Sequence, residues 1–301
     1  MKLDFSDINI LLIGDFMIDH YIKGVSNRVS PEAPVPVVVS EKEYSIPGGA
    51  GNVAMNLRAI GANVTCLGTV GNDIWGERLL SILKNKSINV DGIDIIQNHP
   101  TTLKKRIYSN GKQVARIDTE KILVWNPKIS DYNLDNYDAC IVSDYNKGVV
   151  NNISIDIDIS IVDPKKDNFS EYKNFKIITP NLSELQKATK IKIKNEQEIV
   201  EACNELIGKN NFDYIVAKKG HQGITIVGKD NFVKHIKAHP VYSPDVTGAG
   251  DTVIAILSVA YAKTGDIELS AKIANAAAAN VVAKSGTATT TLKEIEELLF
   301  I

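Results

Sequence analysis

The sequence predicts an α/β protein with a mainly parallel sheet flanked by helices and a small antiparallel β lid. Three observations predict this fold class. Short runs rich in β-branched residues alternate with longer stretches of helical spacing. An apolar share of 44% over 301 residues is enough for a large core. Two segments, about 20–40 and 101–118, interrupt the alternation with short extended runs, and we expect them to form the lid.

The elements of the main sheet follow in chain order. The apolar run 8–13 ends in Gly14 and Asp15, as a buried parallel strand ends at its carboxyl edge. Further strands are predicted at 63–67, 139–142, 159–162, 177–178 and 214–217. Helices are predicted at 49–60, 75–83, 183–188, 196–207, 252–263, 268–283 and 292–299. Residues 151–160 either connect two strands or form one of their own.

The candidate lid has its own strand and turn signals. Its extended runs are residues 35–39, 103–108 and 114–117. Asn110 and Gly111 lie between the last two runs, and this pair is typical of a tight hairpin turn. An exposed sheet of this kind has edges that a second subunit can cover, which favours a homodimer.

Composition and charge exclude several classes of protein. With 34 basic and 36 acidic residues, the net charge of -2 lacks the basic excess that nucleic-acid binding needs. The longest apolar stretches, 252–262 and 273–283, are too short to cross a bilayer, and the N-terminus is unlike a signal peptide. Three single cysteines argue against a disulfide framework or a zinc site. We therefore expect a cytoplasmic protein with no nucleic-acid or membrane partner.

The glycine-rich segment DVTGAGD, from Asp245 to Asp251, directly precedes an apolar helix. Gly248, Ala249 and Gly250 let the backbone approach a ligand, and their amides lie where a helix offers unpaired N–H donors and a positive dipole end. This pattern favours an anion hole for a transferring phosphoryl group, with Asp251 taking the proton of the attacking hydroxyl. A purely structural glycine turn capped by an aspartate is the alternative.

Several motifs together resemble the ribokinase-like (PfkB) carbohydrate kinase family. Besides DVTGAGD, they are GGAGNVAMNL at 48–57, GTVGND at 68–73, TPNLSE at 179–184, and Gly14-Asp15 followed by Asp19. The resemblance spans essentially the whole chain. It implies one kinase domain over residues 1–301 that uses ATP and Mg²⁺. No GxxxxGK[ST] motif is present, so this is not a P-loop kinase.

The resemblance also implies a sugar site. Asp19 lies just past a strand end, where ligands of open α/β sheets bind, and its carboxylate would accept hydrogen bonds from sugar hydroxyls. Gly48 and Gly49 would permit close backbone approach, and Asn52 would offer both a donor and an acceptor. The alternative for Asn52 is a first-turn residue that satisfies backbone donors.

The nucleotide site implied by the resemblance comprises Lys218, Gly220, Gly223, Thr247 and Asn275. Asn275 lies among alanines on a predicted helix. Small residues there accommodate a flat adenine, but they equally allow tight helix packing.

Two metal sites are implied, one at Glu184 and one at Asp245. Asn181 and Glu184 have the spacing of a capping box, and the resemblance adds a role for Glu184 in the water shell of Mg²⁺. Both interpretations can hold together. Asp245 and Thr247 match positions that hold a monovalent cation such as K⁺ in some relatives.

Local segments narrow the substrate within the family. Four segments resemble those of D-glycero-β-D-manno-heptose-7-phosphate kinases: 27–37 (NRVSPEAPVPV), 104–106 (KKR) followed by 116–118 (RID), 143–148 (SDYNKG) and 163–165 (DPK). The resemblance implies a substrate role for Asp144. One position departs from that pattern, because Leu103 stands where those kinases tend to carry a threonine.

Cations in the same regions fit a phosphorylated sugar. Lys104, Arg106 and Arg116 lie in the candidate lid, and Lys165 follows a strand end. Such side chains can clamp a remote phosphate. The alternative for each is an ordinary solvated cation on a strand face.

The resulting hypothesis is transfer of the γ-phosphoryl group of ATP to the anomeric hydroxyl of the heptose 7-phosphate. The product would be the 1,7-bisphosphate, used in lipopolysaccharide or surface-polysaccharide assembly, and a separate nucleotidyltransferase would then be needed. The first alternative is another sugar kinase of this fold, acting on ribose, a hexose or a nucleoside. The others are a non-catalytic sugar-binding regulator and a dinucleotide dehydrogenase, and the missing GxGxxG spacing argues against the dehydrogenase.

Overall fold

The computed structural model describes residues 2–151, 153, 155–173, 175–242, 245–284 and 286–299. Its main sheet has nine strands in the order β13-β12-β11-β10-β9-β8-β1-β4-β5. All pairings from β11 to β5 are parallel, and β12 and β13 extend the other edge antiparallel. The strands are β1 (Asn9–Gly14), β4 (Asn63–Gly71), β5 (Asn89–Ile96), β8 (Ala139–Ser143), β9 (Ser160–Asp163), β10 (Ile177–Ile178), β11 (Tyr214–Lys218), β12 (Ile224–Gly228) and β13 (Val233–Ile236).

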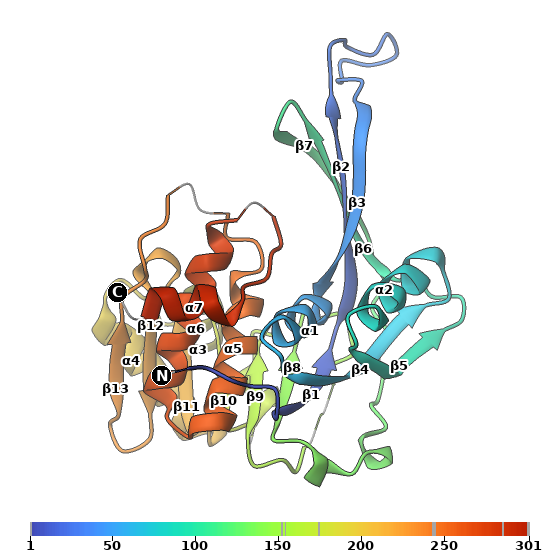
Figure 1. Cartoon of the computed structure of the whole chain (residues 1–301). Helices are drawn as coiled ribbons and strands as arrows, with labels where there is room; N and C mark the ends of the chain where they lie inside the picture. The colour runs from blue at the N-terminus through green and yellow to red at the C-terminus, as the bar shows by residue number, and fades with distance from the viewer. Residues whose placement is uncertain are drawn as a thin grey trace.

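Helices cover both faces of this sheet, as predicted (Figure 1). On β1, Ile10 and Leu12 face one hydrophobic core, and Leu11 and Ile13 face the other. Helices α1, α2, α5, α6 and α7 pack into the first core, and α3 and α4 pack into the second. The helices are α1 (Ala50–Ala59), α2 (Ile74–Lys84), α3 (Leu182–Thr189), α4 (Glu196–Asn210), α5 (Ala249–Thr264), α6 (Ile267–Val282) and α7 (Leu292–Leu299).

A separate small sheet projects from the body of the molecule (Figure 1). Its order is β3-β2-β6-β7, and its pairings are antiparallel except for β2 with β6, which is parallel. The hairpin turn at Asn110-Gly111 is confirmed, with positive φ at both residues. The strands are β2 (Phe16–Val25), β3 (Val39–Gly49), β6 (Thr102–Ser109) and β7 (Lys112–Thr119).

The structure differs from the predicted elements in three places. The run 35–39 is not a strand: Pro36 makes an isolated bridge to Val29, and β3 starts only at Val39. Strands β2, β5, β12 and β13 were not predicted, because interspersed polar or glycine residues mask their apolar pattern. In 151–160, the described residues before Ser160 form no strand, and Asn152 and Ser154 lie outside the described residues.

No helix among the described residues is both long and apolar enough to cross a membrane. The carboxyl ends of β1, β8 and β9 lie side by side in the sheet, and α1 and α5 begin near them. This edge of the sheet brings together segments from the two ends of the chain, as expected for a ligand site in an open α/β sheet.

Candidate active site

The glycine turn before α5 has the geometry that an anion site needs. Gly248 is the N-cap of the helix, with φ +79°, a conformation that favours glycine. A Cβ at Gly248 would also lie 2.8 Å from Nδ2 of Asn52. In the part of the chain that the structure describes, the N–H groups of Gly250 and Asp251 have no hydrogen-bond partner. The first turn of α5 therefore offers open donors at a positive dipole end.

The carboxylate of Asp251 is buried at the start of this helix, with 6% of the residue exposed. Its Oδ1 accepts a 2.6 Å hydrogen bond from the phenol of Tyr145, and its Oδ2 accepts a 2.7 Å bond from Nδ2 of Asn52. Burial raises the pKa of Asp251 to about 6, although both hydrogen bonds favour the ionised form. A carboxylate in this state is ionised at neutral pH and basic enough to accept a proton.

A chain of hydrogen bonds fixes the Asn52 side. Nδ2 of Asn56 donates to the backbone oxygen and to Oδ1 of Asn52, at 3.0 and 3.2 Å. The hydroxyl of Thr252 lies 3.2 Å from Oδ1 of Asn56 and 3.0 Å from the Gly248 carbonyl, and its one proton is shared between these two acceptors. Asn52 lies on α1 and Thr252 on α5, so the network holds the two helix starts in register.

Sequence reasoning missed Tyr145 and did not explain Asp15. The Asp15 carboxylate, only 2% exposed, accepts backbone hydrogen bonds from Tyr145, Lys147 and Val149 at 2.7, 3.1 and 3.3 Å. It thereby shapes the loop that carries the Tyr145 ring to Asp251. Both signals were present in the sequence, as an aspartate at a strand end and as the tyrosine inside the 143–148 motif.

The structure brings the predicted sugar-binding residues together beside this site. A Cβ on Gly48 would lie 2.6 Å from Oδ2 of Asp19, so the carboxylate passes directly over the glycine. Gly49 has φ +57°, and a Cβ there would lie 2.5 Å from the Asp15 carbonyl. Asp19 lies within β2 and not just past the end of a strand as predicted, because β2 starts at Phe16, directly after β1. It forms an ion pair with Arg106 of the neighbouring strand.

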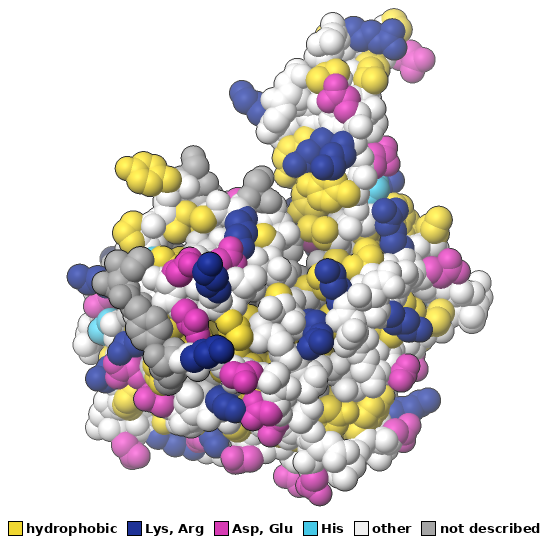
Figure 2. Space-filling view, viewed as in Figure 1, with side chains coloured by type: hydrophobic (Ala, Val, Ile, Leu, Met, Phe, Trp, Pro, Cys, Tyr) yellow, Lys and Arg dark blue, Asp and Glu magenta, His cyan; other side chains and the backbone are white. Residues whose placement is uncertain are grey.

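The predicted lid cations share one face of the small sheet. In its register, Asp19 pairs with Lys104, Lys104 with Asp118, and Arg106 with Arg116, which places these side chains on the same side. Each cation already contacts a carboxylate. Lys104 and Arg116 lie 3.8 and 2.9 Å from the Asp118 carboxylate, and Arg106 contacts Asp19. Figure 2 shows cationic and hydrophobic side chains along this projecting sheet.

The structure separates Asp144 from this group. Asp144 is 3% exposed, and both of its oxygens accept hydrogen bonds: Oδ1 from the Asn146 backbone at 2.6 Å and Oδ2 from the Tyr172 phenol at 2.5 Å. Burial raises its pKa to about 6 as well. No described hydrogen bond links it to Asp251 or Asp19, so its carboxylate supports the fold of the loop.

Except for Thr247, the predicted nucleotide residues border a cavity of about 520 Å³ beside the glycine turn. Its walls include Lys218, Gly220, Gly223, Gly250 and Asn275, and most of the other lining side chains are apolar. Lys218 forms an ion pair with Asp163, and a Cβ on Gly250 would lie 3.4 Å from Nζ of Lys218. The positively charged Lys218 side chain therefore lies where the cavity reaches the start of α5.

Two of the predicted nucleotide residues, Asn275 and Thr247, form hydrogen bonds with other parts of the protein. Asn275 of α6 donates from Nδ2 to the Lys237 carbonyl at 2.8 Å, which fixes one wall of the cavity. Thr247 donates its N–H to Oδ1 of Asp245 at 3.1 Å, and Oδ2 of Asp245 accepts from Gly286 at 2.7 Å. Asp245 therefore ties the glycine turn to the loop after α6.

The predicted capping box is confirmed. Oδ1 of Asn181 accepts from the Glu184 backbone at 2.9 Å, and Oε2 of Glu184 accepts from the Asn181 backbone at 2.8 Å. Oε1 of Glu184 lies 3.5 Å from Nζ of Lys165, so Lys165 faces this carboxylate. Among the described residues, no cluster of three His, Cys, Asp or Glu side chains forms a metal cage. Single oxygen donors fit a Mg²⁺ ion that keeps its waters and is held mainly by phosphates.

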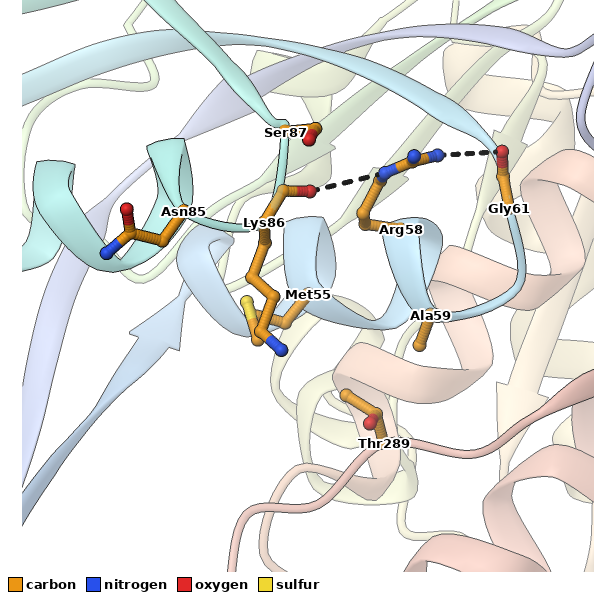
Figure 3. Close-up of a pocket in the computed structure, with 8 residues that line it drawn as sticks. All are labelled: Met55, Arg58, Ala59, Gly61, Asn85, Lys86, Ser87 and Thr289. Atoms are coloured by element: carbon orange, nitrogen blue, oxygen red, sulfur yellow. Dashed lines mark hydrogen bonds between the residues drawn. The ribbon is translucent and has the colours of Figure 1, made fainter.

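A second cavity, of about 470 Å³, lies apart from these residues between α1, the end of α2 and Thr289 (Figure 3). Arg58 lines it, but the guanidinium donates to the carbonyls of Lys86 and Gly61. These hydrogen bonds link the loops that follow α1 and α2. None of the predicted site residues lines this cavity.

Comparisons with known proteins show the family of the chain. The family model described as pfkB family carbohydrate kinase matches residues 7–294. The Bifunctional protein HldE of Campylobacter curvus is 39% identical over 307 residues, which cover 97% of this chain and 65% of that protein. The protein of the same name from Aliarcobacter butzleri is 40% identical over 305 residues, covering 96% and 64%. The chain spans less than two thirds of the length of these relatives.

Solved structures confirm the ribokinase-like fold. A putative ribokinase from Agrobacterium tumefaciens superimposes with a TM-score of 0.78 at 18% identity, over 97% of both chains. Ribokinase from Arabidopsis thaliana, complexed with ribose and ATP, gives a TM-score of 0.76 at 18% identity, over 98% of this chain and 99% of that one.

Proposed function

The chain belongs to the pfkB family of carbohydrate kinases, and from this premise we propose that it phosphorylates the anomeric hydroxyl of D-glycero-β-D-manno-heptose 7-phosphate. ATP is the donor, and the product is the 1,7-bisphosphate. The observation that carries the proposal is the buried Asp251 carboxylate next to open N–H donors at the start of α5. A base and an anion hole side by side are what phosphoryl transfer to a hydroxyl requires.

In this mechanism, Asp251 accepts the proton of the attacking sugar hydroxyl. The N–H groups of Gly250 and Asp251, together with the α5 dipole, stabilise charge on the transferring group. Lys218 lies close to Gly250 and adds a positive charge on the nucleotide side. On the sugar side, Asp19 and Asn52 orient the acceptor, and Gly48 leaves room for it.

The proposed nucleotide site is the cavity of about 520 Å³. Its apolar walls suit an adenine ring, and its glycine-lined end suits the phosphates. Bound Mg²⁺ would neutralise phosphate charge, and Asn181 and Glu184 would hold its water shell. Asp245 and Thr247 are the residues proposed to hold K⁺.

The sugar phosphate is assigned from charge and from local sequence. Lys104, Arg106 and Arg116 lie on one face of the small sheet, the face that carries Asp19. A bound phosphate would compete with the carboxylates of Asp118 and Asp19 for these cations. The Arg116 side chain is 53% exposed and its ion pair is weak, whereas the Arg106–Asp19 pair is largely buried. Lys165 is proposed as a further cation, although it lies beside Glu184. Closure of the small sheet over the sugar would exclude water as a competing acceptor.

A homodimer is proposed on separate grounds. Val39, Val114 and Ile117 of the small sheet are 57%, 45% and 52% exposed. Apolar side chains on a projecting sheet are commonly covered by a second subunit. Light scattering of the purified protein would give the mass directly, and a monomer at all concentrations would exclude the dimer.

The test of function is an ATP-consumption assay with a panel of acceptors. The panel contains the heptose 7-phosphate, the same heptose without phosphate, hexose 6-phosphates and ribose. We expect the heptose 7-phosphate to give the highest kcat/KM. Faster reaction of unphosphorylated sugars would reject the heptose phosphate and favour another sugar kinase, and the absence of ATP turnover with every acceptor would reject the kinase activity.

A further inference from the structure

We propose that Tyr145 is a positioning residue for the base: its phenol keeps Asp251 ionised and aims the carboxylate at the acceptor hydroxyl. This inference rests on the proposed role of Asp251. The family signature at 245–251 does not contain Tyr145, which comes from a loop more than a hundred positions earlier in the chain.

The hydrogen bonds leave the base one free direction on each oxygen. Tyr145 donates to Oδ1 at 2.6 Å, and Asn52 donates to Oδ2 at 2.7 Å. A carboxylate oxygen has two lone pairs, so each oxygen of Asp251 can still accept one proton donor. The two neutral donors fix the carboxylate plane and leave acceptor capacity for the sugar hydroxyl.

The Tyr145 ring is held by the backbone of its own loop. Asp15, at the end of β1, accepts the N–H groups of Tyr145, Lys147 and Val149. The carbonyls of Lys147 and Gly148 accept further bonds from Leu123 and Trp125 at 3.1 and 3.2 Å. A phenol anchored in this way is pre-organised, and positioning by a pre-organised donor costs little entropy.

The charged groups around Asp251 strengthen the case for neutral donors. Lys218 and Asp163 both act on Asp251, but they form an ion pair, and their charges oppose each other. Burial, together with the Asp251 charge, raises the pKa of Tyr145 well above its usual range, so the phenol keeps its proton and remains a donor. Tyr145 and Asn52 are therefore the contacts that offset the burial of the carboxylate.

The first test is the pH dependence of a Tyr145→Phe variant, which loses the donor and keeps the ring. Without this hydrogen bond the ionised form of Asp251 is less stable, so its pKa rises further. We expect kcat/KM to fall about fivefold at pH 6 and to approach the wild-type value near pH 8, with the sugar KM little changed. Tyr172→Phe is the matched control, because it removes the same hydroxyl from a buried aspartate–tyrosine pair. Its profile should follow the wild type.

The second test does not depend on turnover. Aspartate labelled with ¹³C at the carboxyl allows NMR titration of the free protein, and Asp251→Asn assigns the Asp251 signal. The pKa of Asp251 should be higher in Tyr145→Phe than in the wild type, and unchanged in Tyr172→Phe. An unaltered titration of Asp251 in Tyr145→Phe would overturn the inference even if the kinase activity is real. Loss of the proposed function would instead appear as a wild type that turns over no acceptor.

Discussion

Two buried aspartate–tyrosine pairs in this molecule look alike, and we propose different roles for them. Asp251 accepts a hydrogen bond from Tyr145, and Asp144 accepts one from Tyr172, at 2.6 and 2.5 Å. Burial raises the pKa of both carboxyl groups to about 6. The surroundings differ: Asp251 lies in the first turn of α5, whose residues Ala249 and Gly250 line a cavity, whereas the second oxygen of Asp144 accepts from the backbone of its own loop, at Asn146.

The comparison shows that a raised pKa alone does not identify a catalytic base. Structural networks raise the pKa of carboxyl groups as effectively as active sites do. What distinguishes Asp251 is its position at the start of α5, next to N–H donors able to stabilise the group that reacts. Asp144 instead shapes the loop that presents Tyr145, and its contribution is to stability.

The largest effect is expected from Asp251→Asn. The variant keeps the shape of the side chain but removes the base, so turnover should fall about 100-fold or more. Nucleotide affinity, measured by calorimetry, should stay near the wild-type value because the N–H donors of α5 remain. Turnover close to the wild type would show that the base lies elsewhere.

Gly248→Ala should have the next largest effect. Its Cβ would press on Nδ2 of Asn52 and disturb one donor to the base, so we expect a loss of about tenfold in kcat. Gly265→Ala is the matched control, because Gly265 also has positive φ but has open space where its Cβ would lie. Both variants carry backbone strain, of about 1 kcal/mol. Equal activity losses in the two would mean that strain, not the displaced donor, is responsible.

Charge reversal in the small sheet tests the substrate. Lys104→Glu should raise the KM for the sugar phosphate about tenfold with little change in kcat. The reason is that Lys104 would bind the remote phosphate equally well in the ground state and in the transition state. Lys105→Glu is the control on the opposite face of the same strand, where Lys105 lies over the Trp75 ring. If both variants behave alike, the phosphate does not bind at the face that carries Asp19.

The smallest effect on turnover is expected from Asp144→Asn. Loss of the charged acceptor of Tyr172 and Asn146 should lower the free energy of unfolding by about 1–3 kcal/mol. Thermal or urea unfolding measures this change. Turnover should remain within about threefold of the wild type, and a loss as large as that of Asp251→Asn would abolish the distinction between the two pairs.

The sequence was sufficient to predict the fold class and the glycine turn. Alternation of strands and helices gave the parallel sheet, and the segment from Asp245 to Asp251 pointed to the start of α5. Both predictions depend on residue patterns within short stretches of the sequence. The short strand β10 was also predictable, because its two isoleucines lie between turn residues.

Long-range contacts account for what the sequence did not show. Tyr145 reaches Asp251 only because Asp15, 130 positions before it, holds its loop. Asp144 was predicted to bind substrate, and its hydrogen bond from the Tyr172 phenol was not foreseen. The cations of the small sheet were predicted as a set, but their pairing with Asp19 and Asp118 depends on strand register. No local pattern encodes such contacts.

The most direct test of the central claim is the pH profile of kcat/KM for the wild type and Asp144→Asn. Two carboxyl groups have a pKa near 6, and either could produce an activity that rises with pH through that value. With Asp251 as the base, activity rises as Asp251 loses its proton, and Asp144→Asn retains this rise unchanged. If the rise near pH 6 disappears in Asp144→Asn, Asp251 is not the group that activates the sugar.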